Sequence, residues 1–237
     1  MNCPYKAIKL APGFYAVEEG GVRVFLVEGD GEALLIDTGF GSGDLKSFLA
    51  EVTELPVTRL INTHGDMDHV GCNHQFDSIW MHPAEFDRYC AGGQRSLEQV
   101  HPLWEGDKVT IGQRTFEVIL ISGHTPGSIA LLDRENRILI SGDTVQNDAI
   151  YMFGPGRNLP AFVHAIEKLE GMADQFDVVY PSHGDLTVSP DILPVLKQGA
   201  LDVMAGRVEA QPPVREGVPC KLYDCGAVKF LYDFAAK

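Results

Sequence analysis

Short apolar runs, many ended by glycine or aspartate, occupy the first third of the chain. Their length and their content of β-branched and aromatic residues are typical of strands, at residues 13–17, 22–27, 33–36, 58–62 and 78–81. After Asp44, the apolar residues Leu45, Phe48, Leu49 and Val52 recur at the spacing of one helical face, and Pro56 follows as a stop. Strands that alternate with a helix predict an α/β protein.

The remainder of the chain continues this alternation. The pattern predicts helices at residues 84–90, 159–172 and 192–204, and strands at 108–111, 113–121, 129–132, 137–140 and 178–180. Residues 221–223 and 228–232 predict a closing hairpin around Gly226. Residues 92–106 show little periodicity and are interpreted as a surface excursion that borders the functional site.

A cluster of polar side chains follows the strand expected at residues 58–62. The segment His64-Gly65-Asp66-Met67-Asp68-His69 places four potential metal ligands within six residues. Carboxylates and imidazoles gathered at the end of a buried strand carry a large desolvation cost unless a positive charge neutralises them. The segment therefore predicts a bound metal, with a solvated acidic turn as the alternative interpretation.

Three distant residues favour the metal over the solvated turn. His124, Asp143 and His183 each lie beside a glycine in a turn that follows an expected strand. Turns at the ends of neighbouring strands meet at one edge of a sheet, where ligand sites of α/β proteins form. We expect the three residues to lie at the same edge as residues 64–69.

The order of these motifs resembles the metallo-β-lactamase superfamily. That family has an aspartate after an early strand, then an HxHxDH loop, a histidine, an aspartate and a final histidine. The matching residues here are Asp37, the segment 64–69, His124, Asp143 and His183, within about residues 14 to 190. The resemblance implies an α/β (α+β) fold, a four-layer αββα sandwich with metals at one edge, which we expect to form one domain over residues 1–237.

The resemblance also implies a role for each residue. His64, Asp66 and His124 would bind the first metal, Asp68, His69 and His183 the second, and Asp143 would bridge the two. Asp37 would orient the histidine loop. Asp66 departs from the family pattern, which has a histidine at that place.

The expected cofactor is a pair of divalent metal ions, with zinc first and manganese or iron as alternatives because Asp66 adds an oxygen ligand. Water that bridges two such ions loses its proton near neutral pH, and the resulting hydroxide attacks a carbonyl or phosphoryl centre. Asp68 is the candidate catalytic residue that orients this nucleophile and transfers a proton.

The sequence indicates substrate contacts less strongly than it indicates metal ligands. Tyr151 and Arg157 follow Asp143 closely and are candidates for a pocket wall, with Arg157 able to pair with an anionic group. His101 lies in the irregular segment and is a third candidate. We expect structural or surface positions for the other histidines, His74, His82 and His164.

Composition narrows the class of partner and the compartment. The formal net charge of -14 repels a nucleic acid backbone, so nucleic acid is not an expected partner. No apolar run is long enough to span a membrane, and Pro4, Lys6 and Lys9 interrupt the start of the chain where a signal peptide needs an apolar stretch. Five scattered cysteines favour reduced thiols over a disulfide framework or a metal clip at Cys220 and Cys225. We therefore expect a cytoplasmic protein that acts on a small molecule, and no feature indicates an oligomeric state.

The primary functional hypothesis is hydrolysis of a small ester, thioester, lactone or related bond at a dinuclear metal centre. The likeness to glyoxalase II is expected to stop at the metal ligands, because about fifty residues follow His183, and an exported β-lactamase is disfavoured. A non-haem iron redox protein of the same fold is the main alternative. A nuclease and a metal-binding protein without catalysis are two further alternatives.

Overall fold

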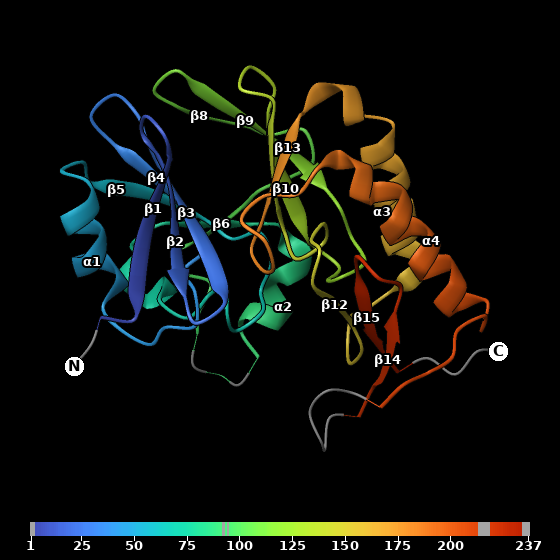
Figure 1. Cartoon of the computed structure of the whole chain (residues 1–237). Helices are drawn as coiled ribbons and strands as arrows, with labels where there is room; N and C mark the ends of the chain where they lie inside the picture. The colour runs from blue at the N-terminus through green and yellow to red at the C-terminus, as the bar shows by residue number, and fades with distance from the viewer. Residues whose placement is uncertain (1–2, 92, 94, 213–218, 234–237) are drawn as a thin grey trace. The chain divides into compact units, whose positions relative to one another are not determined.

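A computed structural model describes residues 3–91, 93, 95–212 and 219–233 of the chain (Figure 1). The chain divides into two units, Met1–Ile119 and Leu120–Lys237. The expectation of one domain over residues 1–237 stays a prediction. Each unit is described by itself below.

The first unit holds a sheet whose strands are neighbours in chain order. Within the described residues this sheet has seven strands: β1 (Tyr5–Ala11), β2 (Phe14–Glu19), β3 (Val22–Glu28), β4 (Ala33–Ile36), β5 (Val57–Ile61), β6 (Ile79–Met81) and β7 (Val100–Pro102). Strands β1 to β4 pair antiparallel, whereas β4 to β7 pair parallel. The parallel pairs bring the carboxyl ends of β4 and β5 side by side.

Helix α1 (Leu45–Val52) covers part of this sheet in the first unit. Asp44 caps the helix by accepting the backbone N–H of Ser47. Leu45 and Leu49 are buried in one hydrophobic cluster with apolar residues of the strands. The unit also contains η1 (Asn73–Gln75), η2 (Pro83–Glu85) and α2 (Phe86–Tyr89). Strand β8 (Lys108–Ile111) forms a hairpin with β9 (Arg114–Leu120), whose last residue begins the second unit.

The second unit combines two groups of strands with two long helices. Strand β10 (Ile129–Asp133) pairs antiparallel with β11 (Ile138–Gly142), which pairs parallel with β13 (Val178–Pro181). A separate three-stranded sheet of this unit has the order β12 (Ala149–Met152), β15 (Lys229–Tyr232) and β14 (Lys221–Asp224). Helices α3 (Leu159–Glu170) and α4 (Leu193–Met204) lie side by side in Figure 1, and the short η3 (Ala173–Gln175) and η4 (Pro190–Ile192) complete the unit.

Most elements expected from the sequence are confirmed, including the helix after Asp44 and the closing hairpin of β14 and β15. The strands β1, β7 and β12 were not expected. Of the β1 residues only Tyr5 is buried, so the apolar residues of this strand carry little periodicity, and β7 and β12 are too short for a clear pattern.

Two expectations need correction. The segment 92–106 was expected to be irregular throughout, yet β7 lies within it; residues 92 and 94 of that segment are outside the described residues. The helix expected at residues 84–90 begins as the 3-10 turn η2 and becomes α-helical at Phe86.

No helix in the described part of the chain is both long and apolar enough to cross a membrane. The described cysteines form no disulfide.

Candidate metal centre

The histidine loop and Asp37 follow two parallel strands that are neighbours in the sheet. Strand β4 ends at Ile36, strand β5 ends at Ile61, and the N–H of Asp37 donates to the carbonyl of Ile61 at 2.8 Å. Asp37 is buried and adopts φ 62, a left-handed conformation that aspartate tolerates better than bulky residues. This turn directs the Asp37 carboxylate toward the segment after β5.

The Asp37 carboxylate accepts hydrogen bonds from both sides of the histidine loop. Its Oδ2 accepts from Nδ1 of His69 at 2.9 Å and from Oγ1 of Thr63 at 2.6 Å, and its Oδ1 accepts from the N–H of Thr63 at 2.8 Å. Nδ1 of His64 lies 3.1 Å from Oγ1 of Thr63. Since the Thr63 hydroxyl gives its proton to Asp37, His64 is the donor in that last contact.

Proton placement in this network fixes the tautomer of both histidines. His64 and His69 each carry the proton on Nδ1, which leaves a lone pair on Nε2 as a metal ligand requires. The Asp37 carboxylate therefore orients His69 directly and His64 through Thr63.

The ligand atoms of the loop form two neighbouring pairs. Nε2 of His64 lies 3.5 Å from Oδ2 of Asp66, and Nε2 of His69 lies 3.8 Å from Oδ2 of Asp68. The two imidazole rings have their centroids 4.0 Å apart. Each pair joins residues that the family resemblance assigns to the same metal, His64 with Asp66 and Asp68 with His69.

The backbone of the loop is held by residues that the sequence analysis did not single out. The carbonyl of His69 accepts from the N–H of Thr38 at 2.8 Å, from the Thr38 hydroxyl at 3.2 Å and from Nδ2 of Asn62 at 3.0 Å. Thr38 directly follows Asp37, and Asn62 ends the strand expected at residues 58–62. Their positions next to these features were the only signal in the sequence.

Arg88 and Glu85 form another unexpected part of the surroundings. Arg88 donates to Oδ1 of Asp66 at 2.7 Å, and the buried Glu85 accepts the N–H of Gly65 at 2.8 Å. Both residues come from the turn formed by η2 and α2. No sequence motif predicts these two residues, because only the folding of the chain brings them into contact with the histidine loop.

The three remaining candidates lie together in the second unit. Asp143 follows β11 and His183 follows β13, and these strands are parallel neighbours. Oδ2 of Asp143 lies 3.5 Å from Nε2 of His124 and 3.5 Å from Nε2 of His183. One carboxylate oxygen is thus equidistant from two imidazole nitrogens.

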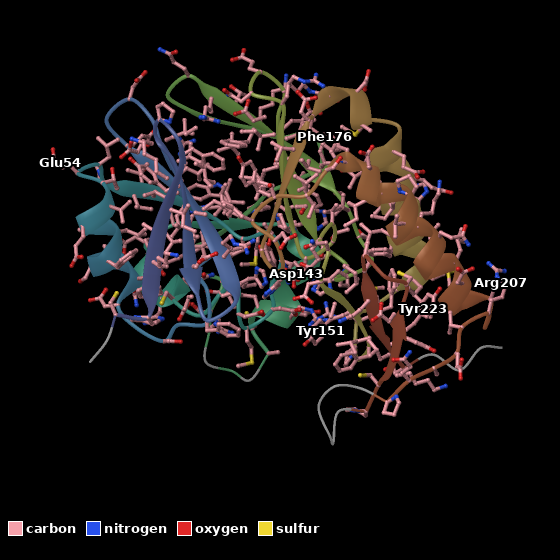
Figure 2. All side chains as sticks on the ribbon, in the orientation of Figure 1. Glu54, Asp143, Tyr151, Phe176, Arg207 and Tyr223 are labelled. Atoms are coloured by element: carbon pink, nitrogen blue, oxygen red, sulfur yellow. The ribbon has the colours of Figure 1, made fainter. Side chains whose placement is uncertain are left out.

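His124 is oriented by the backbone of the same unit. Its Nδ1 donates to the carbonyl of Tyr151 at 3.1 Å, so Nε2 carries the lone pair that faces Asp143; both Tyr151 and Asp143 are labelled in Figure 2. Arg157 donates to the carbonyl of His124. Tyr151 and Arg157 therefore contact the candidate ligand itself, and Tyr151 is 44% exposed.

The other histidines lie in separate places. His101 is exposed on β7, where its ring stacks on Trp80 with centroids 4.8 Å apart. His74 and His164 are exposed. Burial lowers the pKa of His82, whose Nδ1 accepts the N–H of Ala84 and caps η2. His82 therefore has a structural role as the cap of η2.

The donor set suits a divalent metal ion. The candidate ligand atoms are imidazole nitrogens and carboxylate oxygens, and His64, His69, His124 and Asp143 are buried. Such a set fits zinc and also the harder ions manganese and iron.

Comparisons with known proteins give a consistent result. The family model described as the metallo-beta-lactamase superfamily matches residues 17–183. The acyl-coenzyme A thioesterase MBLAC2 of Homo sapiens is 26% identical over 225 residues, which cover 76% of this chain and 81% of the relative. The hydroxyacylglutathione hydrolase of Rippkaea orientalis is 31% identical over 171 residues, which cover 65% of this chain and 64% of the relative.

A solved structure shares the fold. A metallo-beta-lactamase from Pontibacter korlensis superposes with a TM-score of 0.70 at 19% identity, covering 84% of this chain and 99% of that one. At this identity the likeness concerns the fold alone, and it confirms the expected α/β fold class.

Proposed function

Because the chain belongs to the metallo-β-lactamase superfamily and is a metal-dependent hydrolase, we propose that it hydrolyses a small acyl thioester at a centre of two divalent metal ions. The observation that carries the proposal is the position of Asp143, whose Oδ2 lies 3.5 Å from the Nε2 atoms of both His124 and His183. A carboxylate oxygen shared by two imidazoles suits a ligand that joins two ions.

The proposed ligand sets follow the order of motifs in the family. The first ion is assigned to His64, Asp66 and His124, the second to Asp68, His69 and His183, and the bridge to Asp143. Two facts support this division: Asp66 lies beside His64, and Asp68 lies beside His69. Zinc is the first expectation for both ions, with manganese or iron as alternatives.

These residues would hold two divalent ions, which when bound would supply activation of a water molecule and polarisation of the substrate carbonyl. The chain itself supplies oriented ligands: Asp37, acting directly and through Thr63, keeps the Nε2 lone pairs of His69 and His64 available. Asp68, whose side chain is 25% exposed, is proposed to orient the attacking water and accept its proton.

Both relatives named above carry thioesterase or thioester-related names, acyl-coenzyme A thioesterase and hydroxyacylglutathione hydrolase. Thioester chemistry also suits the proposed site. A thiol has a pKa of about 8.5, so a thiolate departs without a dedicated acid to protonate it. Asp68 then only has to accept the proton of the attacking water, whereas with an amide the same group would also have to deliver a proton to the departing amine.

The proposal is tested with the full chain loaded with zinc or manganese. We expect turnover of acyl-coenzyme A or acylglutathione thioesters, and at least about a 100-fold loss of kcat in Asp68→Asn. His74→Ala is the matched control, because His74 is exposed on η1 and outside the proposed ligands. Full activity of Asp68→Asn, or hydrolysis of oxygen esters without any hydrolysis of thioesters, would show that the proposal is wrong.

A further inference from the structure

The two carboxylate oxygens of Asp66 have different partners. Oδ1 accepts from Arg88 at 2.7 Å, whereas Oδ2 lies 3.5 Å from Nε2 of His64. One oxygen is held by a guanidinium, and the other faces the ring nitrogen oriented for a metal. The exposed fractions of the Arg88 and Asp66 side chains are 25% and 16%, so solvent screens this ion pair less than a surface pair.

Arg88 comes from a turn that also contacts the loop through its backbone. Oε2 of the buried Glu85 accepts the N–H of Gly65 at 2.8 Å and lies 4.0 Å from Nε of Arg88. A Cβ at Gly65 would lie 3.1 Å from that oxygen, a tight contact that Glu85 would relieve only by moving a few tenths of an ångström. Gly65 and Asp66 are consecutive, and the turn therefore holds the loop at two adjacent residues.

We propose that Arg88 is the positioning residue that lets an aspartate at position 66 serve as a one-oxygen ligand of the first metal. This inference rests on the proposed metal centre and explains the residue at which the chain departs from the HxHxDH pattern. Without Arg88, Asp66 would lose this hydrogen bond to Oδ1, and that oxygen would be available as a second donor to the metal. With Oδ1 held by Arg88, Asp66 presents one donor atom, as an imidazole does.

Charge supports the same role. An aspartate at position 66 adds one negative charge that a neutral histidine would not bring. The guanidinium of Arg88 offsets that charge at 2.7 Å, and it lies farther, at 4.0 Å, from Glu85. The formal charge of the Asp66–Arg88 pair is therefore the same as that of a neutral histidine.

A double-mutant cycle tests the proposal on the full chain. Metal-free wild type, Arg88→Ala, Asp66→His and the double variant are titrated with zinc by calorimetry, and bound zinc is counted by elemental analysis. We expect Arg88→Ala to weaken the first site by about 10- to 100-fold when Asp66 is present. In the Asp66→His background, where the carboxylate is gone, we expect the same change to alter affinity by about twofold or less.

Two further variants separate positioning from folding. Arg95→Ala is the matched control. Arg95 lies over the ring of Tyr89, 5.5 Å from the ring centroid, and Tyr89 is the neighbour of Arg88 on α2. This variant should bind zinc like the wild type. Arg88→Gln removes the charge but keeps a polar side chain over Gly65, and it replaces Arg88→Ala if thermal unfolding shows that Arg88→Ala is not folded.

The outcomes distinguish this inference from the proposed function. Wild-type protein that binds fewer than two ions contradicts the dinuclear centre on which the inference rests. Wild-type protein that binds two ions, with no loss of affinity in Arg88→Ala and Arg88→Gln, overturns the role of Arg88 alone. An equal loss in the wild-type and Asp66→His backgrounds also overturns it, since Arg88 would then act without the carboxylate.

Discussion

A single carboxylate, that of Asp37, determines the proton positions on two candidate ligands. Within the part of the chain that the structure describes, its two oxygens accept from the N–H and hydroxyl of Thr63, from Nδ1 of His69 and, at 3.5 Å, from Nδ2 of Asn62. An ionised carboxylate meets this demand because it only accepts. The left-handed φ of 62 places it there, and aspartate and asparagine are the non-glycine residues that tolerate this conformation best.

We expect Asp37→Asn to weaken metal binding while it preserves the backbone turn. The amide has only one accepting oxygen, so its NH2 group faces either the His69 and Thr63 side chains or the Thr63 N–H. The expected loss in zinc affinity is about 10- to 100-fold, with about 1 to 3 kcal/mol of stability lost to the unsatisfied buried donor. Calorimetric titration and thermal unfolding measure the two effects.

The control for this variant is Asp44→Asn, which changes the exposed cap of α1 outside the proposed centre. Its zinc affinity should equal that of the wild type. Asp37→Asn with wild-type affinity would contradict the assignment of Asp37 as the orienting residue.

At the scale of elements, the loop that carries His124 is held against the start of helix α3. The N–H of Asn158, the residue that caps α3, donates to the carbonyl of Gly123 at 2.8 Å. A Cβ at Gly123 would lie 2.4 Å from both N and Cα of Phe162, and its φ of +142 is one that other residues rarely adopt. A glycine beside His124 thus permits a loop-to-helix contact that fixes where the imidazole lies.

Gly123→Ala should therefore both destabilise the protein and displace His124. Backbone strain alone costs about 1 to 3 kcal/mol, and overlap with the backbone of α3 adds to it, so we expect a total loss of about 3 kcal/mol or more. Gly154→Ala is the matched control, because Gly154 has φ +83 but nothing within 4 Å of its Cβ position. Chemical denaturation that gave equal losses for the two variants would contradict the proposed overlap with α3.

At the scale of the whole molecule, the candidate ligands come from both halves of the sequence. Residues 64–69 belong to the first unit, and His124, Asp143 and His183 belong to the second. The formal net charge of the chain is -14, so bound cations also reduce the repulsion among its acidic groups.

We expect about two divalent ions per chain after reconstitution with zinc, manganese or iron. Ions that bind only the folded state stabilise it by mass action, by about 2.7 kcal/mol for one site at a free concentration of 100 times the Kd. Chelation should accordingly lower the melting temperature, and Asp143→Ala should reduce both the metal content and this shift. His164→Ala, which changes an exposed residue of α3, should leave both unchanged. A metal content of one ion or fewer in the wild type would rule out the dinuclear proposal.

The sequence by itself determined the strand and helix pattern around the motifs and the identity of the candidate ligands. These features are local: a strand of β-branched residues and the HGDMDH segment after it are readable without the fold. The family and its fold also followed from the order of motifs, and the family match over residues 17–183 confirms them.

The resemblance already implied that Asp37 orients the histidine loop, but only the tertiary structure decided through which atoms it does so, and only the structure added Arg88. The contact of Asp37 with His69 spans 32 positions and that of Arg88 with Asp66 spans 22. The first depends on the parallel pairing of β4 with β5, and the second on the turn that follows β6. Pairing between distant segments is set by the packing of the whole sheet, and a side chain gains its partner only when that packing brings the two together.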